Sequence, residues 1–259
     1  MDTDTITTLL QDVAAEVINP RFRSLSSSDV HEKNPGDLVT VADHEAEVLI
    51  TAALQAAYPD ALVLGEEATA ADPRLLERYA VAEHAFTVDP VDGTKNFVNG
   101  SPDHAVMAAE LRSGQVVRSW IWQPQHQLMY VAQLGAGAWR NGERLRFTLA
   151  TSPPRVATSR RSWVGRELPG LSSPTLTWAS CGIDFPRLVE GETDVLLYGS
   201  TKPWDHAPGA LLVAEAGGVA RTLTDRPYDP RHESWDGMIA AADLAAYGLA
   251  QAAWARELR

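Results

Sequence analysis

The chain is poor in cysteine and in basic residues. Cys181 is the one cysteine among 259 residues, which excludes an internal disulfide and favours a reducing compartment such as the cytoplasm. The 34 acidic residues outnumber the 22 basic ones, and the net charge is −12. We therefore expect no nucleic-acid partner bound through a general basic surface, and no long-range attraction of anionic ligands. If the protein acts on a phosphate, bound cations must reverse the local charge.

Long hydrophobic runs are also missing. The N-terminus, Met1-Asp2-Thr3-Asp4, is acidic and lacks the apolar segment of a signal peptide. The most apolar stretch, residues 238–255, is interrupted by Asp243 and Gln251, so we expect a closing helix over 240–258 and no membrane span. These features predict a cytoplasmic protein without a membrane partner.

The hydrophobic pattern predicts two halves of different character. Residues 1–150 have helical patterns at 5–19 and about 41–57, with Thr40 as N-cap. Three strands expected at 105–111, 116–122 and 128–132 predict an antiparallel meander. Asn141-Gly142 predicts a two-residue hairpin. Residues 151–259 alternate strands and helices. The fold class is therefore α/β, with an α+β first half and an α/β second half. Other strands are expected at 61–64, 85–88, 156–159, 194–198 and 219–223, and other helices after Asp72-Pro73, at 182–188 and at 205–216.

One hexapeptide, Asp89-Pro90-Val91-Asp92-Gly93-Thr94, follows the β-prone run at 85–88. Proline and glycine in these positions predict a rigid turn with two carboxylates and bare backbone amides, which suit a divalent cation and a phosphate. Asp-Pro-x-Asp-Gly on its own is an ordinary surface turn. Its significance comes from further carboxylates that follow a strand or begin a helix, namely Glu66, Glu67 and Asp205.

Converging carboxylates need a cation between them. Two of them at about 4 Å repel each other by roughly 1–4 kcal/mol, depending on the effective dielectric constant. An all-oxygen ligand set without paired Cys or clustered His favours Mg²⁺, with Mn²⁺ as a substitute, over zinc. The seven histidines are scattered along the sequence.

Taken together, the motifs resemble the inositol monophosphatase family of Mg²⁺-dependent, lithium-sensitive phosphatases. The matching motifs, which occur in family order within residues 33–218, are Asp37-Leu38-Val39-Thr40-Val41-Ala42-Asp43, Gly65-Glu66-Glu67, the hexapeptide, Trp204-Asp205-x-Ala207 and Glu215-Ala216-Gly217-Gly218. The resemblance implies a layered αβαβα sandwich, as in fructose bisphosphatases, and a homodimer. It also implies hydrolysis of a small phosphorylated metabolite with two or three Mg²⁺ per site.

The resemblance further implies residue roles. Glu66, Asp89 and the Val91 carbonyl would hold one metal, and Asp89, Asp92 and Asp205 a second. Asp43 and Thr94 would position and activate the attacking water, assisted by Glu66. The Gly93 and Thr94 amides would receive the phosphate. The residues expected to contact substrate are Asp92, Gly93, Thr94, Ser180, Cys181, Asp184, Tyr198 and Asp205. Lys33 lies one residue closer to Asp37 than the family lysine does.

Two departures from the family pattern concern the substrate. Members that hydrolyse inositol phosphate usually carry an acidic residue seven positions before the aspartate of Trp-Asp, where this chain has Tyr198. The Ser180-Cys181-Gly182 stretch also differs from the usual small residues. An inositol-1-phosphate-type substrate is the first expectation, and histidinol phosphate, fructose 1,6-bisphosphate and 3′-phosphoadenosine 5′-phosphate are alternatives. Tyr198 fits a core aromatic as well, and Asp184 is the residue expected to recognise a different substrate.

The sequence leaves two other interpretations open. Haloacid-dehalogenase-like phosphatases use Asp-x-Asp-Gly-Thr with an aspartate nucleophile, whereas this chain has one more residue between the aspartates. The protein could also be a metal-binding regulatory homologue without activity. Such a homologue would be expected to lack some of the metal ligands, whereas this chain has all of them.

Overall fold

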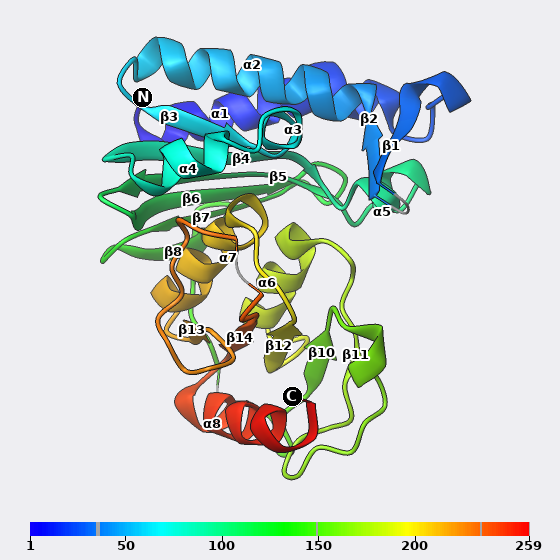
Figure 1. Ribbon diagram of the computed structural model, residues 1–259, viewed down its shortest axis with the longest axis vertical. Helices are drawn as coiled ribbons and strands as arrows, with labels where there is room; N and C mark the ends of the chain where they lie inside the picture. The colour runs from blue at the N-terminus through cyan, green and yellow to red at the C-terminus, as the bar shows by residue number, and fades with distance from the viewer. Residues whose placement is uncertain (35–36, 149, 234, 259) are drawn as a thin grey trace.

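The computed structural model describes residues 1–34, 37–148, 150–233 and 235–258. Helices and sheets alternate in layers from top to bottom of the molecule (Figure 1). Two long helices cover a seven-stranded sheet, two more lie between this sheet and a five-stranded sheet, and a last helix covers the far side. This is the αβαβα sandwich that the sequence predicted. The loop expected at 33–36 falls partly outside the described residues.

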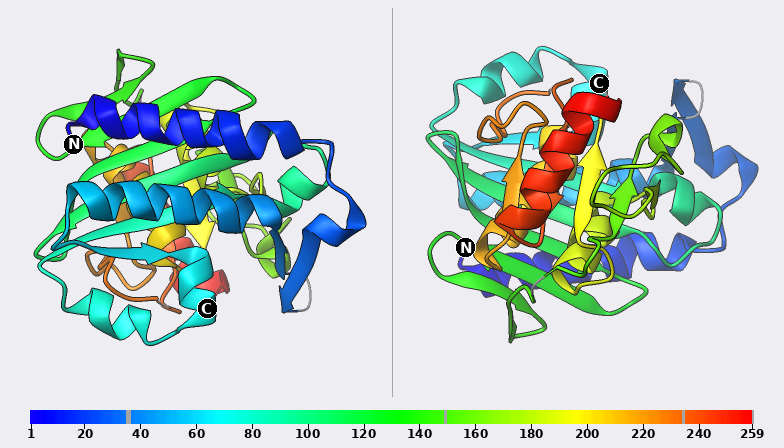
Figure 2. Two further views of the ribbon diagram at one scale, coloured as in Figure 1. Left: turned by 90° about the horizontal axis from the view of Figure 1, so that it is seen from above. Right: turned by 90° about the horizontal axis from the view of Figure 1, so that it is seen from below.

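The outer helical layer consists of α1 (Thr3–Val13) and α2 (Val41–Ala57), which lie side by side across the sheet (Figure 2, left). Helix α1 continues through a π-helical turn, Ala14–Ile18, and a 3₁₀ turn, Asn19–Arg21. Thr40 caps α2 as predicted, because its side chain accepts a hydrogen bond from the Ala42 amide. The apolar faces of both helices are buried against the sheet.

The first sheet has the strand order β3-β4-β5-β6-β7-β8-β9. Strands β3 and β4 are parallel and the other neighbours are antiparallel, so the predicted meander and the hairpin at Asn141-Gly142 are confirmed. A separate pair, β1 with β2, stands at one end. The bounds are β1 (Val30–Asn34), β2 (Asp37–Thr40), β3 (Leu62–Gly65), β4 (His84–Asp92), β5 (Ala105–Arg112), β6 (Gln115–Gln123), β7 (Leu128–Gln133), β8 (Gly137–Arg140) and β9 (Glu143–Leu145), with short helices α3 (Glu66–Ala71), α4 (Leu75–Ala80) and α5 (Thr94–Val98).

The second sheet has the order β11-β10-β12-β14-β13. Its strands are β10 (Val156–Thr158), β11 (Thr175–Leu176), β12 (Val195–Tyr198), β13 (Val219–Arg221) and β14 (Met238–Ala241). The middle helices, α6 (Cys181–Val189) and α7 (Pro203–Glu215), pack between the sheets. Helix α8 (Leu244–Ala253), followed by the π-helical turn Trp254–Leu258, covers the outer face (Figure 2, right). The two sheets come from residues 62–145 and 156–241, and the division at residue 150 stays a prediction.

The expected helix over 240–258 was wrong at its start. Residues 238–241 form β14, which lies between β12 and β13, and the helix begins only after its N-cap, Asp243. Strand β14 is buried along its whole length, and a short apolar run buried on both sides has no alternation that distinguishes a strand from a helix. Within the described residues, no helix is long and apolar enough to cross a bilayer.

The crossing of α6 and α7 provides a test of the packing. A Cβ added at Gly209 would lie 2.0 Å from Cδ2 of the buried Phe185 ring. We expect Gly209→Ala to lower the free energy of unfolding by about 1–3 kcal/mol, because the ring must move within a filled core. Urea unfolding measures the change.

Gly248→Ala is the matched control for this variant. A Cβ added at Gly248 in α8 would meet no described atom within 4 Å. Because alanine has the higher helix propensity, Gly248→Ala should raise the free energy of unfolding by about 0.5–1 kcal/mol. Equal effects of the two substitutions would contradict the tight α6–α7 contact.

Candidate metal centre

Three carboxylates from different elements meet at one edge of the first sheet. Glu66 begins α3 directly after β3, Asp89 lies near the end of β4, and Asp205 lies in the first turn of α7. One oxygen of each lies within 4.8 Å of the others. Because β3 and β4 are parallel, their carboxyl ends reach the same edge, which explains how Glu66 and Asp89 come together.

The prediction of a rigid turn across the hexapeptide was wrong for its first four residues, because β4 continues through Asp92. Asp89 pairs with Met107 and Asp92 with Ala105, so β4 has one more residue than β5 over this interval, which is a β-bulge. Met107 and Ala105 face the same side of the sheet, and the bulge therefore places both aspartates on that side. The backbone turns only at Gly93, which has φ of 83°.

Asp43 and Thr94 form a hydrogen-bonded pair, as the proposed roles require. The Thr94 hydroxyl lies 3.0 Å from Asp43 Oδ1 and also 3.0 Å from the Val91 carbonyl oxygen. The other oxygen of Asp43 accepts hydrogen bonds from the amide and hydroxyl of Thr40, at 2.9 and 2.5 Å. Burial raises the pKa of Asp43 from 3.8 to about 7, although the bonds from Thr40 oppose the shift.

Asp92 lies outside the group of three carboxylates and joins the first sheet to α6. Its carboxylate accepts hydrogen bonds from the Ser180 hydroxyl, the Cys181 amide at 3.1 Å and the Gly182 amide at 2.6 Å. These donors begin α6, so Asp92 acts as its cap from a distant strand. Burial raises the pKa of Asp92 to about 7, and its Oδ1 accepts only one of these three bonds.

The sequence interpretation gave no role to two residues beside the cluster. Lys33 Nζ lies 2.8 Å from Glu66 Oε1 and 2.9 Å from Glu67 Oε1, so it orients both glutamates. Burial opposes its charge, but the two carboxylates raise the pKa of Lys33 overall. Glu47 accepts 2.8 Å hydrogen bonds from the Glu67 and Ala68 amides and thereby fixes the start of α3.

Glu47 could have been found from its spacing. It lies four residues after Asp43 on α2, so the two buried carboxylates lie on one face of the helix. A Cβ at Gly65 would lie 2.2 Å from Glu47 Cδ, which shows how closely Glu47 packs below the Gly-Glu-Glu motif.

The negative charges of the clustered carboxylates repel one another, which disfavours the ionised form of Asp89 and Asp205. Burial raises the pKa of Asp89 well above its ordinary range, with Glu66, Asp92 and Asp205 adding to the shift. Burial also raises the pKa of Asp205 to about 8, and Lys202 opposes the rise. A set of mutually repelling oxygen donors with no sulfur or nitrogen fits a hard divalent cation such as Mg²⁺.

A pocket of about 250 Å³ opens beside this cluster. It is lined by all of the residues predicted for substrate contact except Gly93 and Thr94, namely Asp92, Ser180, Cys181, Asp184, Tyr198 and Asp205, together with Lys202 and His206. The Tyr198 hydroxyl donates a 2.9 Å hydrogen bond to Asp184, whose other oxygen accepts the Trp178 amide at 2.8 Å. Tyr198 is therefore both a buried core aromatic and a wall of the pocket.

Comparisons with known proteins agree with this geometry. The model of the inositol monophosphatase family matches residues 2–258. An inositol-1-monophosphatase of Mesorhizobium japonicum is 31% identical over 222 residues, and a protein of Pseudomonas aeruginosa named Nus factor SuhB is 31% identical over 226 residues. The matches cover 81% of both chains for the first and 82% of both for the second.

A solved structure supports the fold. Staphylococcal inositol monophosphatase-1, described as a LiCl-soaked inhibitory complex, superimposes with a TM-score of 0.83 at 20% identity, over 98% of this chain and 94% of its own. The family match also excludes the haloacid-dehalogenase interpretation, because it extends over nearly the whole chain.

The raised pKa values predict how stability depends on pH. Asp43, Asp92 and Asp205 have folded-state pKa values of about 7, 7 and 8, above their ordinary 3.8, so the folded state holds their protons more tightly. That stabilisation is full below pH 4 and is lost as pH rises through 7 and 8. When a chelator keeps the protein free of metal ions, we expect the free energy of unfolding to fall by at least about 1 kcal/mol from pH 6.5 to 8.

Urea unfolding at these two pH values makes the measurement. The buried histidines His104 and His206 have lowered pKa values, so their cost to stability disappears above pH 6.5, which opposes the fall by less than about 1 kcal/mol in total. Asp205→Asn is the comparison variant and should make the fall smaller. The other carboxyl groups with raised pKa values keep part of it, namely Asp43, Asp92, Glu47 and Asp184. A stability of the wild type that rises toward pH 8 would contradict the burial of these carboxyl groups.

Proposed function

The chain belongs to the inositol monophosphatase family, and on that premise we propose that it is a Mg²⁺-dependent phosphomonoesterase of small phosphorylated metabolites. The observation that carries the proposal is the approach of Glu66, Asp89 and Asp205 to within 4.8 Å of one another. An inositol-1-phosphate-type substrate is the first candidate, as the name of the Mesorhizobium relative suggests. Histidinol phosphate, fructose 1,6-bisphosphate and 3′-phosphoadenosine 5′-phosphate are the alternatives.

The proposed metal ligands come from both halves of the chain. Glu66, Asp89 and the Val91 carbonyl would hold one Mg²⁺, while Asp89, Asp92 and Asp205 would hold another. When bound, the cations supply an activated water and offset the charge that develops on the phosphate and its leaving oxygen. Asp92 has an oxygen available for this role, because Oδ1 accepts a single hydrogen bond from α6.

Asp43 and Thr94 provide a path for the proton of the attacking water. Thr40 holds one carboxylate oxygen of Asp43, which leaves Oδ1 directed at the Thr94 hydroxyl. When Thr94 donates to Asp43, its hydroxyl oxygen is free to accept a proton from water. Burial raises the pKa of Asp43, which strengthens it as a proton acceptor.

The phosphate would bind where β4 passes into α5. Gly93 is the N-cap of α5, and the first amides of a helix have no partners within the helix. A Cβ at Gly93 would lie 2.9 Å from Ser180 Cβ, so the turn has room only for glycine. In this proposal the Gly93 and Thr94 amides therefore approach the phosphate closely.

The assembly and location are also part of the proposal. We expect a cytoplasmic homodimer without a nucleic-acid or membrane partner, on the family resemblance and the net charge of −12. Sedimentation velocity tests the dimer, and a monomer at micromolar concentration would contradict it.

A regulatory role is the second candidate. One relative, at 31% identity, is named as a Nus factor and not as an enzyme. A folded, Mg²⁺-binding protein without phosphatase activity toward the four substrates above would favour this candidate over the first.

Substitution of a proposed ligand should abolish activity without unfolding the protein. Asp205→Asn removes one charge from the cluster, and we expect kcat to fall by about 100-fold or more, because the cation that offsets transition-state charge is lost. Phosphate release in Mg²⁺ measures kcat, and thermal unfolding verifies the fold.

Asp60→Asn is the matched control, since Asp60 is an exposed aspartate in a turn, and it should leave kcat unchanged. Activity of Asp205→Asn near that of the wild type would mean that the centre is misplaced. The proposal includes inhibition by Li⁺, and undiminished activity in high Li⁺ would remove that part of it.

The Tyr198–Asp184 pair should determine affinity for the leaving group. Tyr198→Phe removes a hydrogen bond to a carboxylate in the pocket, and we expect KM to rise about tenfold for the best substrate with little change in kcat. Tyr130→Phe is the matched control, because its hydroxyl donates to Glu190, which does not line the pocket. Unchanged KM in Tyr198→Phe would assign Tyr198 to the core alone.

A further inference from the structure

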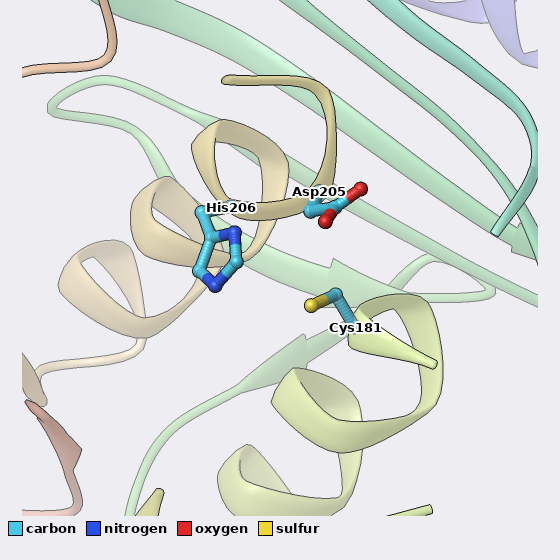
Figure 3. Close-up of side chains that lie close together, drawn as sticks. All are labelled: Cys181, Asp205 and His206. Carbon is cyan, nitrogen blue, oxygen red and sulfur yellow. The ribbon is translucent and has the colours of Figure 1, made fainter. Parts of the chain in front are cut away.

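A second group of possible metal ligands adjoins the carboxylate cluster and differs from it in chemistry. The Cys181 sulfur, one Asp205 oxygen and one His206 ring nitrogen lie within 4.8 Å of one another. Cys181 begins α6, and the other two lie in the first turn of α7. Figure 3 shows the three side chains gathered where the starts of these helices face each other.

His206 has coordinating capacity that its surroundings leave unused. The side chain is buried, with 4% of the residue exposed. Its Nδ1 lies 3.2 Å from the Lys202 carbonyl oxygen, whereas Nε2 has no hydrogen-bond partner in the part of the chain that the structure describes. Buried ring nitrogens are normally hydrogen-bonded, so the unpaired Nε2 of His206 requires an explanation. Burial lowers the pKa of His206 to about 3, which keeps the imidazole neutral, as a metal ligand must be.

The donor set points to a different metal from the first centre. Sulfur, imidazole nitrogen and a single carboxylate oxygen are the ligands of zinc, whereas the cluster of Glu66, Asp89 and Asp205 offers only oxygen. Asp205 belongs to both sets. We propose that Cys181, Asp205 and His206 form a Zn²⁺ site that overlaps the proposed magnesium centre through Asp205 and so makes Zn²⁺ an inhibitor.

The spacing and the access are suitable for such an ion. Ligands of a tetrahedral zinc lie about 2.0–2.3 Å from the metal and therefore about 3–4 Å from one another. A spacing within 4.8 Å thus needs an approach of at most about 1–2 Å, which side-chain rotation supplies. All three residues line the 250 Å³ pocket, which gives entry and leaves the fourth position for water. On binding, Zn²⁺ replaces the proton of the Cys181 thiol, and the proton passes to solvent.

The Zn²⁺ site itself does not depend on the proposed function, but inhibition by Zn²⁺ does. Two effects of the bound ion would cause that inhibition. A Zn²⁺ held here withdraws Asp205 from magnesium. It also occupies the pocket that Tyr198 and Asp184 line, where the leaving group of the substrate would lie.

Co²⁺ is the probe that tests the site, because a thiolate ligand gives it an intense charge-transfer band in the near ultraviolet. Cys181 is the chain's one cysteine, so the band can arise from no other residue. We expect the band when wild-type protein is titrated with Co²⁺, and we expect Zn²⁺ to abolish it. Cys181→Ser should lack the band. Its Zn²⁺ affinity, measured by competition with a chromophoric chelator, should fall at least about tenfold.

His206→Gln supplies an independent variant, with an expected loss of Zn²⁺ affinity of at least about tenfold. Circular dichroism verifies that each variant is folded. If a variant does not fold, the Co²⁺ absorption band of the wild-type protein still tests the site. No band in folded wild type at saturating Co²⁺, or equal Zn²⁺ affinity in Cys181→Ser, would overturn the site. A band in a protein without phosphatase activity would keep the site and refute the proposed function instead.

Discussion

The carboxylates of Glu66, Asp89 and Asp205 repel one another, and the fold nevertheless holds them together at one edge of the first sheet. They come from α3, β4 and α7, and folding brings one oxygen of each within 4.8 Å of the others. Burial makes their charges still more costly, which explains the raised pKa values of both aspartates. In the proposed function, a divalent cation would relieve this repulsion and allow the acidic site to accept a phosphate. Because the net charge is −12, binding of a phosphate would require such a local reversal of charge.

The surrounding fold holds this arrangement through buried carboxylates at helix starts. Asp43 closes the capping box of α2, Glu47 binds the first amides of α3, and Asp92 binds those of α6. Each helix start carries or borders a residue of the site. Backbone amides favour negative charge there, and the same bonds fix the positions of the side chains. Lys33 adds the one ammonium group that contacts both glutamates of the Gly-Glu-Glu motif in the described structure.

Much of the fold and the candidate site could be predicted from local sequence. Thr40 with the apolar pattern after it marked α2, and the Asn141-Gly142 pair marked its hairpin. The bulge between Asp89 and Asp92 could not be predicted, because it depends on pairing with β5. Strand β14 was missed because Met238–Ala241 is apolar throughout and shows no alternation of polar and apolar residues. It becomes a strand by pairing with β12 and β13. The meeting of Cys181 with His206 arises only when α6 packs on α7, and no local pattern records it.

The two proposed metal sites thus share Asp205, one with oxygen ligands only and one with sulfur and nitrogen as well. The first is the central claim, since the proposed reaction and the proposed inhibition both require it. The most direct test is a crystal grown with Mn²⁺ and measured for anomalous scattering. We expect a peak among the oxygens of Glu66, Asp89 and Asp205. A map with these side chains well ordered and no anomalous peak between them would contradict it.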